Sequence, residues 1–409
     1  MSAPVPASLW RHRSFLAFFT GRTLSVTAFQ IFSVAVGWQV YALTRSAWDL
    51  GLVGLMQFLP MLLLALPAGH LADSRDRRTL ALLSLAGYTA LAAVLTVGSH
   101  QGWLGREGLF ALAFGFGMVR AIEFPAASAM LPGLVTSEQL VGALSLSGSA
   151  RQTAFILGPA LGGGLYVFGP TVTHGVTTLL FLAALVSTSL IRYRQPPREK
   201  EPVTWATLFA GITYIRSQPV LLGAISLDLF AVLLGGATAL LPVYAREILL
   251  TGPMGLGVLR AAPAVGALLM SFWLAKHPVE RQVGKAMFAS VAVFGLATVV
   301  FAVSTSMTLS VLMLGVLGAA DMISVVVRSA LVQLETPDAM RGRVGAVNWL
   351  FIGTSNQLGE FESGATAAWF GVVPSVVVGG LGTLAVVGLW MRWFPALAKR
   401  DRLLEHHPH

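Results

Sequence analysis

The sequence predicts an all-α membrane protein with about twelve transmembrane helices, arranged as two six-helix bundles. Three observations support this fold class: the composition, the spacing of the apolar stretches and an internal repeat. Of the 409 residues, 55% are hydrophobic and 11% are charged, whereas a soluble domain carries about 25% charged residues. So few charges cannot cover the surface of a soluble protein of this length. Lipid must therefore form part of its solvent.

Apolar stretches recur along the whole chain, and each approaches the roughly 20 residues that cross a hydrocarbon core about 30 Å thick as a helix. Glycine and proline are frequent inside these stretches, which membrane helices tolerate better than soluble ones. The predicted spans cover residues 14–41, 47–68, 79–98, 108–130, 141–166, 172–191, 219–244, 254–275, 285–304, 307–327, 343–370 and 373–394.

The net charge of +9 raises the possibility of nucleic acid binding, but the distribution of the charge indicates membrane topology instead. With the N-terminus inside, the outer loops hold only Arg45, Arg106 and Arg246. This positive-inside bias predicts a bacterial inner-membrane protein with both termini in the cytoplasm, bound to lipid and not to nucleic acid. The inner segments hold Arg11, Arg13, Arg75, Arg77, Arg78, Arg192, Arg194, Arg198, Lys200, Arg216, Lys276, Arg281, Lys285, Arg341, Arg343, Arg392, Lys399, Arg400 and Arg402.

The chain also repeats itself at an offset of 203 residues. The matched pairs are Gly54 with Gly257, Pro60 with Pro263, Arg78 with Arg281, Ala127 with Ala330, and Gly142-Ala143 with Gly345-Ala346. This order predicts a bundle over residues 1–191, a cytoplasmic linker over 192–218, a second bundle over 219–394 and a cytoplasmic tail over 395–409. Two parallel halves are a transporter architecture, in which the substrate site lies between the halves near the midplane.

The linker contains apolar residues at helical spacing, from Trp205 to Ile215. Thr204 is in position to cap this segment. We therefore expect a short helix in the headgroup region, on the cytoplasmic side.

The most specific motif runs from Gly69 to Arg78, between the second and third spans, with the sequence GHLADSRDRR. It resembles the signature of the major facilitator superfamily, Gly-x-Leu-Ala-Asp followed by basic residues. Further motifs that fit are Phe58-Leu-Pro60, Leu131-Pro-Gly-Leu-Val135, Gly158-Pro-Ala-Leu-Gly162-Gly163, Glu335-Thr-Pro-Asp338 and Arg341-Gly-Arg343-Val344. Together they resemble the branch of bacterial twelve-helix exporters that includes enterobactin exporters and macrolide-efflux proteins.

The loop motif has its own physical interpretation. Gly69 permits a tight helix end, Asp73 is placed to face a helix N-terminus or an arginine, and Arg77 and Arg78 can bind helix C-terminal carbonyls or a carboxylate. Such contacts would form a gating latch that holds one state shut, although the charges could also serve topology alone. The resemblance implies that Glu123 is the partner of Arg77 and Arg78, the alternative being a proton or substrate site.

In the second half, Lys276 stands where the first half has Asp73. The latch that the resemblance implies is therefore degraded in that half.

A second motif, in the fifth span, comprises Gly158, Pro159, Gly162 and Gly163. In the superfamily this pattern marks exporters and antiporters, although Ala154 stands here where the longer pattern has glycine. The alternative is ordinary close packing of helices through small residues.

Charges at membrane depth are the candidates for a substrate or coupling site. Arg22, Arg120, Asp228 and Asp321 lie in spans one, four, seven and ten, which the resemblance places around a central cavity. Each costs at least about 2.5–3.5 kcal/mol in hydrocarbon unless it has a partner, water or a function. The other candidates at this depth are Arg151, Arg260, Glu360 and Glu362.

Three interpretations of these charges remain open. They could be fixed ion pairs that hold helices together. A buried carboxyl group of Asp228, Asp321, Glu360 or Glu362 could carry a proton and couple transport to the proton gradient. Arg22 and Arg120 could attract an anionic or phenolate-bearing substrate.

The sequence thus predicts a proton-coupled exporter of a siderophore- or drug-like small molecule, working by alternating access as a monomer. The chain has no phosphate-binding glycine-rich loop and no zinc-protease or serine-hydrolase motif, so we expect no enzyme activity, no metal and no cofactor. The alternatives are an importer of a metabolite or iron chelate with the same fold, and a membrane receptor that transports nothing.

Overall fold

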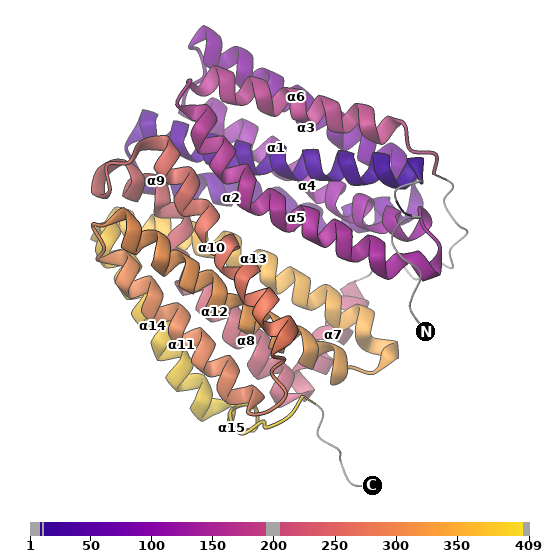
Figure 1. The fold of residues 1–409 in the computed structure, drawn as a ribbon, viewed down its shortest axis with the longest axis vertical. Coiled ribbons are helices and arrows are strands. Elements are labelled where there is room, and N and C mark those ends of the chain that lie inside the picture. Colours follow the sequence, from indigo (N-terminus) through magenta and orange to yellow (C-terminus); the bar gives the residue numbers. More distant parts are fainter. Residues whose placement is uncertain (1–8, 10–11, 194–204, 404–409) are drawn as a thin grey trace. The chain divides into compact units, whose positions relative to one another are not determined.

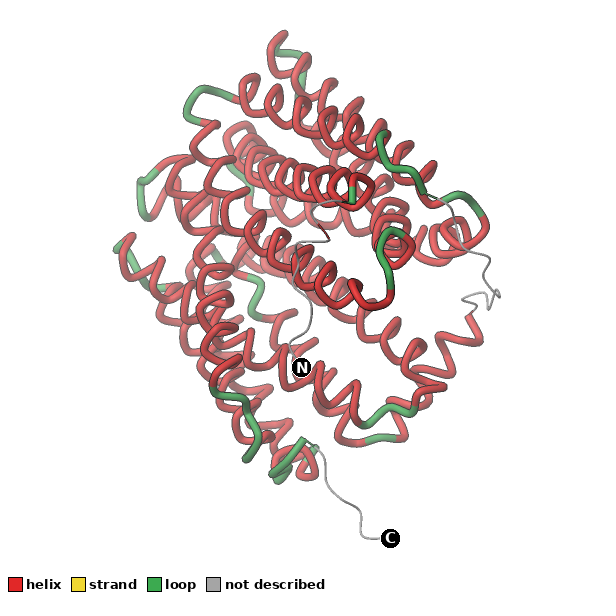
Figure 2. The backbone as a smooth tube through the Cα atoms, turned by 45° about the vertical axis from the view of Figure 1, so that its right-hand side comes forward, coloured by secondary structure: helices red, strands yellow, loops and turns green. Residues whose placement is uncertain are grey.

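The computed structural model describes residues 9, 12–193 and 205–403. Within these ranges every regular element is helical, and the helices are joined by short loops (Figure 2). The helices of the first half are α1 (Arg13–Thr44), α2 (Ala47–Ser74), α3 (Arg77–Gln101), α4 (Arg106–Met130), α5 (Ser137–Tyr166) and α6 (Pro170–Ser189) (Figure 1).

The second half begins with the linker helix that the sequence predicts, α7 (Trp205–Ser217). Thr204, the expected cap, lies outside the described residues. The remaining helices are α8 (Pro219–Leu234), α9 (Leu241–Val243), α10 (Gly252–Lys276), α11 (Val283–Ala302), α12 (Met307–Leu334), α13 (Asp338–Phe370), α14 (Val372–Trp393) and α15 (Pro395–Ala398).

The seventh predicted span is not a regular helix along its whole length. After α8 the chain passes Gly235 and Gly236, forms a 3₁₀ turn over Ala237–Leu240, and ends in a π-helical turn over Tyr244–Ile248. A Cβ on Gly236 would lie 2.6 Å from the carbonyl oxygen of Gly359 in α13. Only glycine permits this approach, and it places the break in the helix against α13.

Ten of the described helical segments are long and apolar enough to cross a membrane. The two predicted spans outside this set, α5 and α13, are helices of 30 and 33 residues. They are more polar because they carry charges such as Arg151, Glu360 and Glu362. The predicted number of twelve spans is therefore confirmed for ten.

The chain divides into two compact units. The first comprises Met1–Arg45, Met56–Val203 and Leu256–Ala261, and the second comprises Ser46–Leu55, Thr204–Gly255 and Ala262–His409. In the first unit α1 packs against α5 and α6, and α3 packs against α4 and α6. In the second, α11 packs against α12 and α14, while α13 contacts α7 and α8.

The linker helix α7 belongs to the second unit, where it lies against α13. A Cβ on Gly211 would lie 2.8 Å from the carbonyl oxygen of Arg343. Burial and the nearby Glu335 carboxylate raise the pKa of the Tyr214 hydroxyl. It therefore stays protonated and donates a hydrogen bond of 2.7 Å to the carbonyl oxygen of Glu335.

Candidate functional site

Two charged clusters lie inside the helix bundles, one in each unit. In the first unit, Arg22 of α1 forms an ion pair with Glu123 of α4. Glu123 is buried, and both side chains line a small cavity together with Phe18, Ser25 and other residues of α1, α3 and α4. The pair joins two helices that the superfamily resemblance assigns to the central cavity.

Arg120 lies three residues before Glu123 on the same helix, and its described contact is aromatic. Its guanidinium carbon lies 4.2 Å from the centre of the Phe29 ring, a cation–π geometry. Phe29 in turn belongs to a cluster with Phe32, Tyr88 and Phe116. The first-unit cluster thus holds two arginines and one carboxylate, which is an excess of positive charge.

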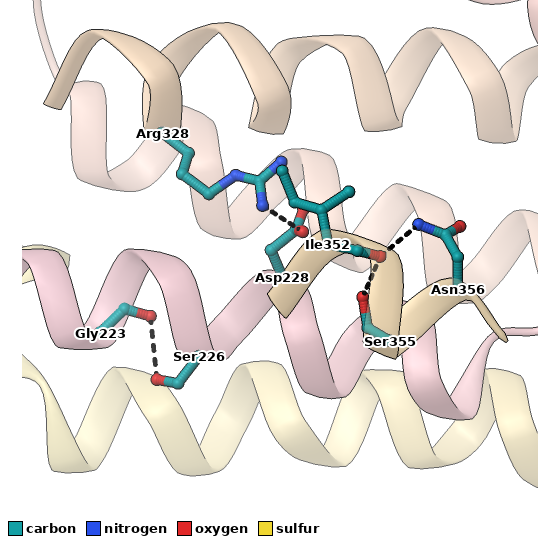
Figure 3. Close-up of polar contacts among 7 residues, drawn as sticks. All are labelled: Gly223, Ser226, Asp228, Arg328, Ile352, Ser355 and Asn356. Atoms are coloured by element: carbon teal, nitrogen blue, oxygen red, sulfur yellow. Dashed lines mark hydrogen bonds and ion pairs between the residues drawn. The ribbon is translucent and has the colours of Figure 1, made fainter. Parts of the chain in front are cut away.

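In the second unit, Arg328 of α12 donates a hydrogen bond of 2.6 Å to Asp228 of α8 (Figure 3). The side chain of Arg328 is 4% exposed and that of Asp228 is 6% exposed. Removing one member of such a pair leaves an uncompensated charge in an apolar interior. The contact therefore ties α8 firmly to α12.

Asp321 lies seven residues before Arg328 on α12, close to two full turns, so both project from one face of the helix. Asp228 and Asp321 line one small cavity. The second-unit cluster therefore holds two carboxylates and one arginine, which is an excess of negative charge. The cavity is lined by Asp228, Ala231, Val232, Val291, Phe294, Ala320, Asp321 and Ser324.

Arg328 is the residue that sequence analysis missed. The predicted tenth span ended at residue 327, whereas α12 continues to Leu334. The spacing of seven between Asp321 and Arg328 was an available signal, because it places an acid and a base on the same helix face.

The two glutamates of α13 lie outside this cavity. The Oε2 atom of Glu360 lies 2.9 Å from the position that a Cβ on Gly54 would take. Glu362 accepts a hydrogen bond of 3.5 Å from the Ser363 hydroxyl. Both side chains are half-buried, and a role of either in coupling stays a prediction.

Arg151 is less buried than the sequence predicts, because it is exposed on α5. Its charge nevertheless lies close enough to Arg22 for the two arginines to repel each other. Its role in a substrate site stays a prediction.

In the loop motif, Arg77 and Arg78 bind backbone carbonyls near helix ends, as one of the two expectations had it. Arg77 donates a hydrogen bond of 2.9 Å to Ala129 near the end of α4. Arg78 donates one of 2.6 Å to Ser189, the last residue of α6. Asp76 caps α3 by accepting a hydrogen bond of 2.7 Å from the Thr79 amide.

Two expectations about this motif are corrected. The partner of Glu123 is Arg22 rather than Arg77 or Arg78, because Glu123 faces α1. Helix α2 does not end at Gly69 but continues to Ser74. The side chain of Asp73 lies outside the described residues.

The Gly158–Gly163 motif brings α5 close to α1. A Cβ on Gly158 would lie 2.5 Å from the Cβ of Gln30, and one on Gly162 would lie 3.1 Å from the Cα of Ile31. On another side of α5, a Cβ on Gly257 would lie 2.6 Å from the Pro159 oxygen and 3.2 Å from the Cα of Gly163. These contacts favour the packing interpretation of the motif.

Comparison with known proteins gives matches over nearly the whole chain. A family model described as a transmembrane secretion effector, of the major facilitator type, matches residues 5–404. The enterobactin exporter EntS of Salmonella choleraesuis (strain SC-B67) is 26% identical over 381 residues, covering 92% of this chain and 91% of that protein. The EntS protein of Citrobacter koseri is also 26% identical, with the same coverage.

Solved transporter structures share the fold. A bacterial homologue of the human lysosomal transporter Spinster, in an inward-facing and unoccupied conformation, superposes with a TM-score of 0.76 at 14% identity, covering 96% of this chain and 99% of that chain. The POT family transporter PepTSo superposes with a TM-score of 0.72 at 14% identity, covering 95% and 99%. At these identities the likeness concerns the fold alone.

Proposed function

Because the chain belongs to the transmembrane secretion effector family of the major facilitator superfamily, and is therefore a membrane transporter, we propose that it exports a small molecule by alternating access. The observation that carries the direction of transport is the match to curated exporters over 92% of this chain. A shared fold alone leaves the direction open, since importers and exporters use the same architecture.

The transported molecule is anionic and siderophore- or drug-like. The first-unit cluster supports this substrate class, because Arg22 and Arg120 are offset by Glu123 alone. One positive charge therefore remains to attract an anion, beside the aromatic surface of Phe29. Protons that enter the cell in exchange for the substrate drive the export. The protein lies in the bacterial inner membrane with both termini on the cytoplasmic side.

Transport into inside-out membrane vesicles tests this proposal. Enterobactin, as an anionic catecholate, and erythromycin, as a macrolide, are presented separately under an imposed proton gradient. We expect accumulation of enterobactin that a protonophore abolishes and that vesicles without the protein lack.

Two outcomes would contradict the proposal. Gradient-driven uptake only in right-side-out vesicles would identify an importer. Failure of both compounds and of an anionic dye panel to undergo counterflow would identify a receptor that moves nothing.

A further inference from the structure

The second-unit cluster is out of electrostatic balance. Arg328 is paired with Asp228 at 2.6 Å, and one guanidinium carries a single positive charge. Asp321 adds a second carboxylate to the cavity that Asp228 lines. With both aspartates ionised, the cluster carries one uncompensated negative charge inside a helix bundle, which is costly at membrane depth.

The cavity supplies no other group that offsets this charge. The wall formed by α8 contributes Asp228 with two apolar residues, and the wall formed by α11 contributes only Val291 and Phe294. Asp228, Asp321 and the neighbouring Arg328 are thus the ionisable groups that face one another here. A cation from outside the protein is therefore needed to neutralise the cluster.

Ser324 gives a second sign that the two aspartates of the cavity differ. It lies on α12 between Asp321 and Arg328, on the same helix face. Ser324 is 2% exposed and lines the cavity, and its hydroxyl lies close to the Asp228 carboxylate, whose ionised form it stabilises. A hydroxyl beside Asp228 favours the ionised form of that residue, so Asp321 is the carboxylate that remains for the proton.

We propose that Asp321, next to Ser324 and the Asp228–Arg328 pair, is the proton-binding residue of the transporter. This inference rests on the proposed proton-driven export and names the residue that carries the coupling proton. The proton comes from water on one side, forms an O–H bond at the Asp321 carboxylate and neutralises the cluster. On release to the other side the O–H bond breaks and the negative charge returns.

The ion pair explains why Asp321, rather than Asp228, takes the proton. The Arg328 guanidinium directly faces Asp228 (Figure 3), and a charge-assisted hydrogen bond favours the ionised carboxylate. Side chains of a helix tilt toward its N-terminus, so Arg328 leans from its own turn toward Asp321. When Asp321 loses its proton, its carboxylate therefore competes with that of Asp228 for Arg328. This competition couples protonation to the position of α8 against α12.

Infrared difference spectroscopy of the purified, lipid-reconstituted protein tests the site with the proton as the only probe. We expect the wild-type difference spectrum between acidic and alkaline buffer to contain a protonated-carboxyl band. The band is lost in Asp321→Asn and retained in Glu362→Gln, which alters a half-buried acid of the same unit outside the cavity. A band that persists in Asp321→Asn, or disappears in Glu362→Gln, would overturn the assignment.

Two further arms keep the test decisive. If Asp321→Asn fails to fold, ¹³C-aspartate labelling should shift the wild-type band but leave the band of Asp321→Glu unshifted. Replacing potassium with sodium at constant pH should leave the protonated-carboxyl band unchanged. Loss of the band in sodium would show that the cavity binds a metal cation instead of a proton. The spectra need no substrate and therefore test the proton site independently of transport. Failure of the vesicle experiment would refute the export function but not the assignment of Asp321.

Discussion

Arg328 of α12 and Asp228 of α8 form a buried ion pair at 2.6 Å, in which the base lies on the later helix. The first unit has the opposite arrangement, because Arg22 on α1 is the base and Glu123 on α4 is the acid. At the repeat offset of 203 residues, Asp228 corresponds to Ser25, which lies one turn after Arg22. The two halves therefore keep an equivalent contact between helices but exchange its polarity.

Breaking the second-unit pair on one side should destabilise the protein strongly. Asp228→Leu leaves Arg328 charged and unpaired in an apolar surrounding, which costs about 3–5 kcal/mol. The double variant Asp228→Leu/Arg328→Met removes both charges and should recover most of the loss. Thermal unfolding of the purified protein measures both effects.

The matched control is Arg106→Ala, because Arg106 lies in an exposed ion pair with Glu107 at 3.4 Å. Exposed pairs contribute about 0–1 kcal/mol, so this variant should unfold near the wild-type temperature. A double variant as unstable as Asp228→Leu would show that the pair is not the source of the effect.

Arg120 should determine binding of an anionic substrate more than its neighbour Arg22, because Glu123 already compensates the charge of Arg22. Arg120→Ala should weaken the binding of enterobactin about tenfold or more, an effect of about 1.4 kcal/mol. Arg120→Lys keeps the charge over the Phe29 ring and should retain part of the affinity. Fluorescence quenching or calorimetry on detergent-solubilised protein provides the measurement.

A compound without an anionic group supplies the control for this variant. Erythromycin, a cation at neutral pH through its tertiary amine, should lose no affinity in Arg120→Ala, since it presents no anion to the guanidinium. Equal loss of binding for the anionic and the cationic ligand would point to damage of the aromatic cluster around Phe29 instead.

The sequence identifies the membrane helices because each needs a long apolar run, and this signal is local. It also identifies Asp228 and Asp321, since any ionisable residue in an apolar span stands out. The pairing of charges is not local. Arginines on both α1 and α3 are available to pair with Glu123. Which of them forms the ion pair depends on how the helices are rotated about their axes, and in the structure it is Arg22.

Arg151 shows that the exposure of a charge is also not readable from the sequence. A charge within a predicted span is equally visible in the sequence whether it is buried or, like Arg151, exposed. The Gly158 motif was ambiguous for a related reason, since a glycine permits either close packing or flexibility, and its neighbour Gln30 of α1 becomes known only in three dimensions.

The glycines that join α5 to α1 should be intolerant of even one methyl group. Gly158→Ala would place a Cβ 2.5 Å from that of Gln30. This overlap forces the helices apart, at a cost of about 1–3 kcal/mol. A lowered melting temperature of the purified protein is the expected result.

Gly164, the residue directly after the motif on the same helix, is the control. A Cβ there has no heavy atom within 4 Å, so Gly164→Ala should be neutral or stabilising by up to about 1 kcal/mol, because alanine favours helix more than glycine does. Equal destabilisation by both substitutions would mean that α5 tolerates no alanine for reasons other than contact with α1.

The segment after α15 is predicted to be fastened to the second unit through Arg400. This side chain is 8% exposed, pairs with Glu335 at the end of α12, and donates a hydrogen bond of 2.9 Å to the carbonyl oxygen of Arg402. Its own carbonyl oxygen accepts a hydrogen bond of 2.9 Å from the amide of Gly284 in α11. Loss of the side chain should therefore release this backbone contact.

Hydrogen exchange at the Gly284 amide reports that release directly, because exchange follows local opening. Arg400→Ala should accelerate it about tenfold or more, as expected when a charge-assisted hydrogen bond of about 1.5–3 kcal/mol is removed. Arg402→Ala is the matched control, since it keeps the carbonyl that Arg400 binds and alters only an exposed side chain, 66% accessible. If the Gly284 amide exchanges equally fast in both variants, the backbone contacts hold the segment without the Arg400 side chain. The ion pair with Glu335 then contributes nothing to the attachment of the segment.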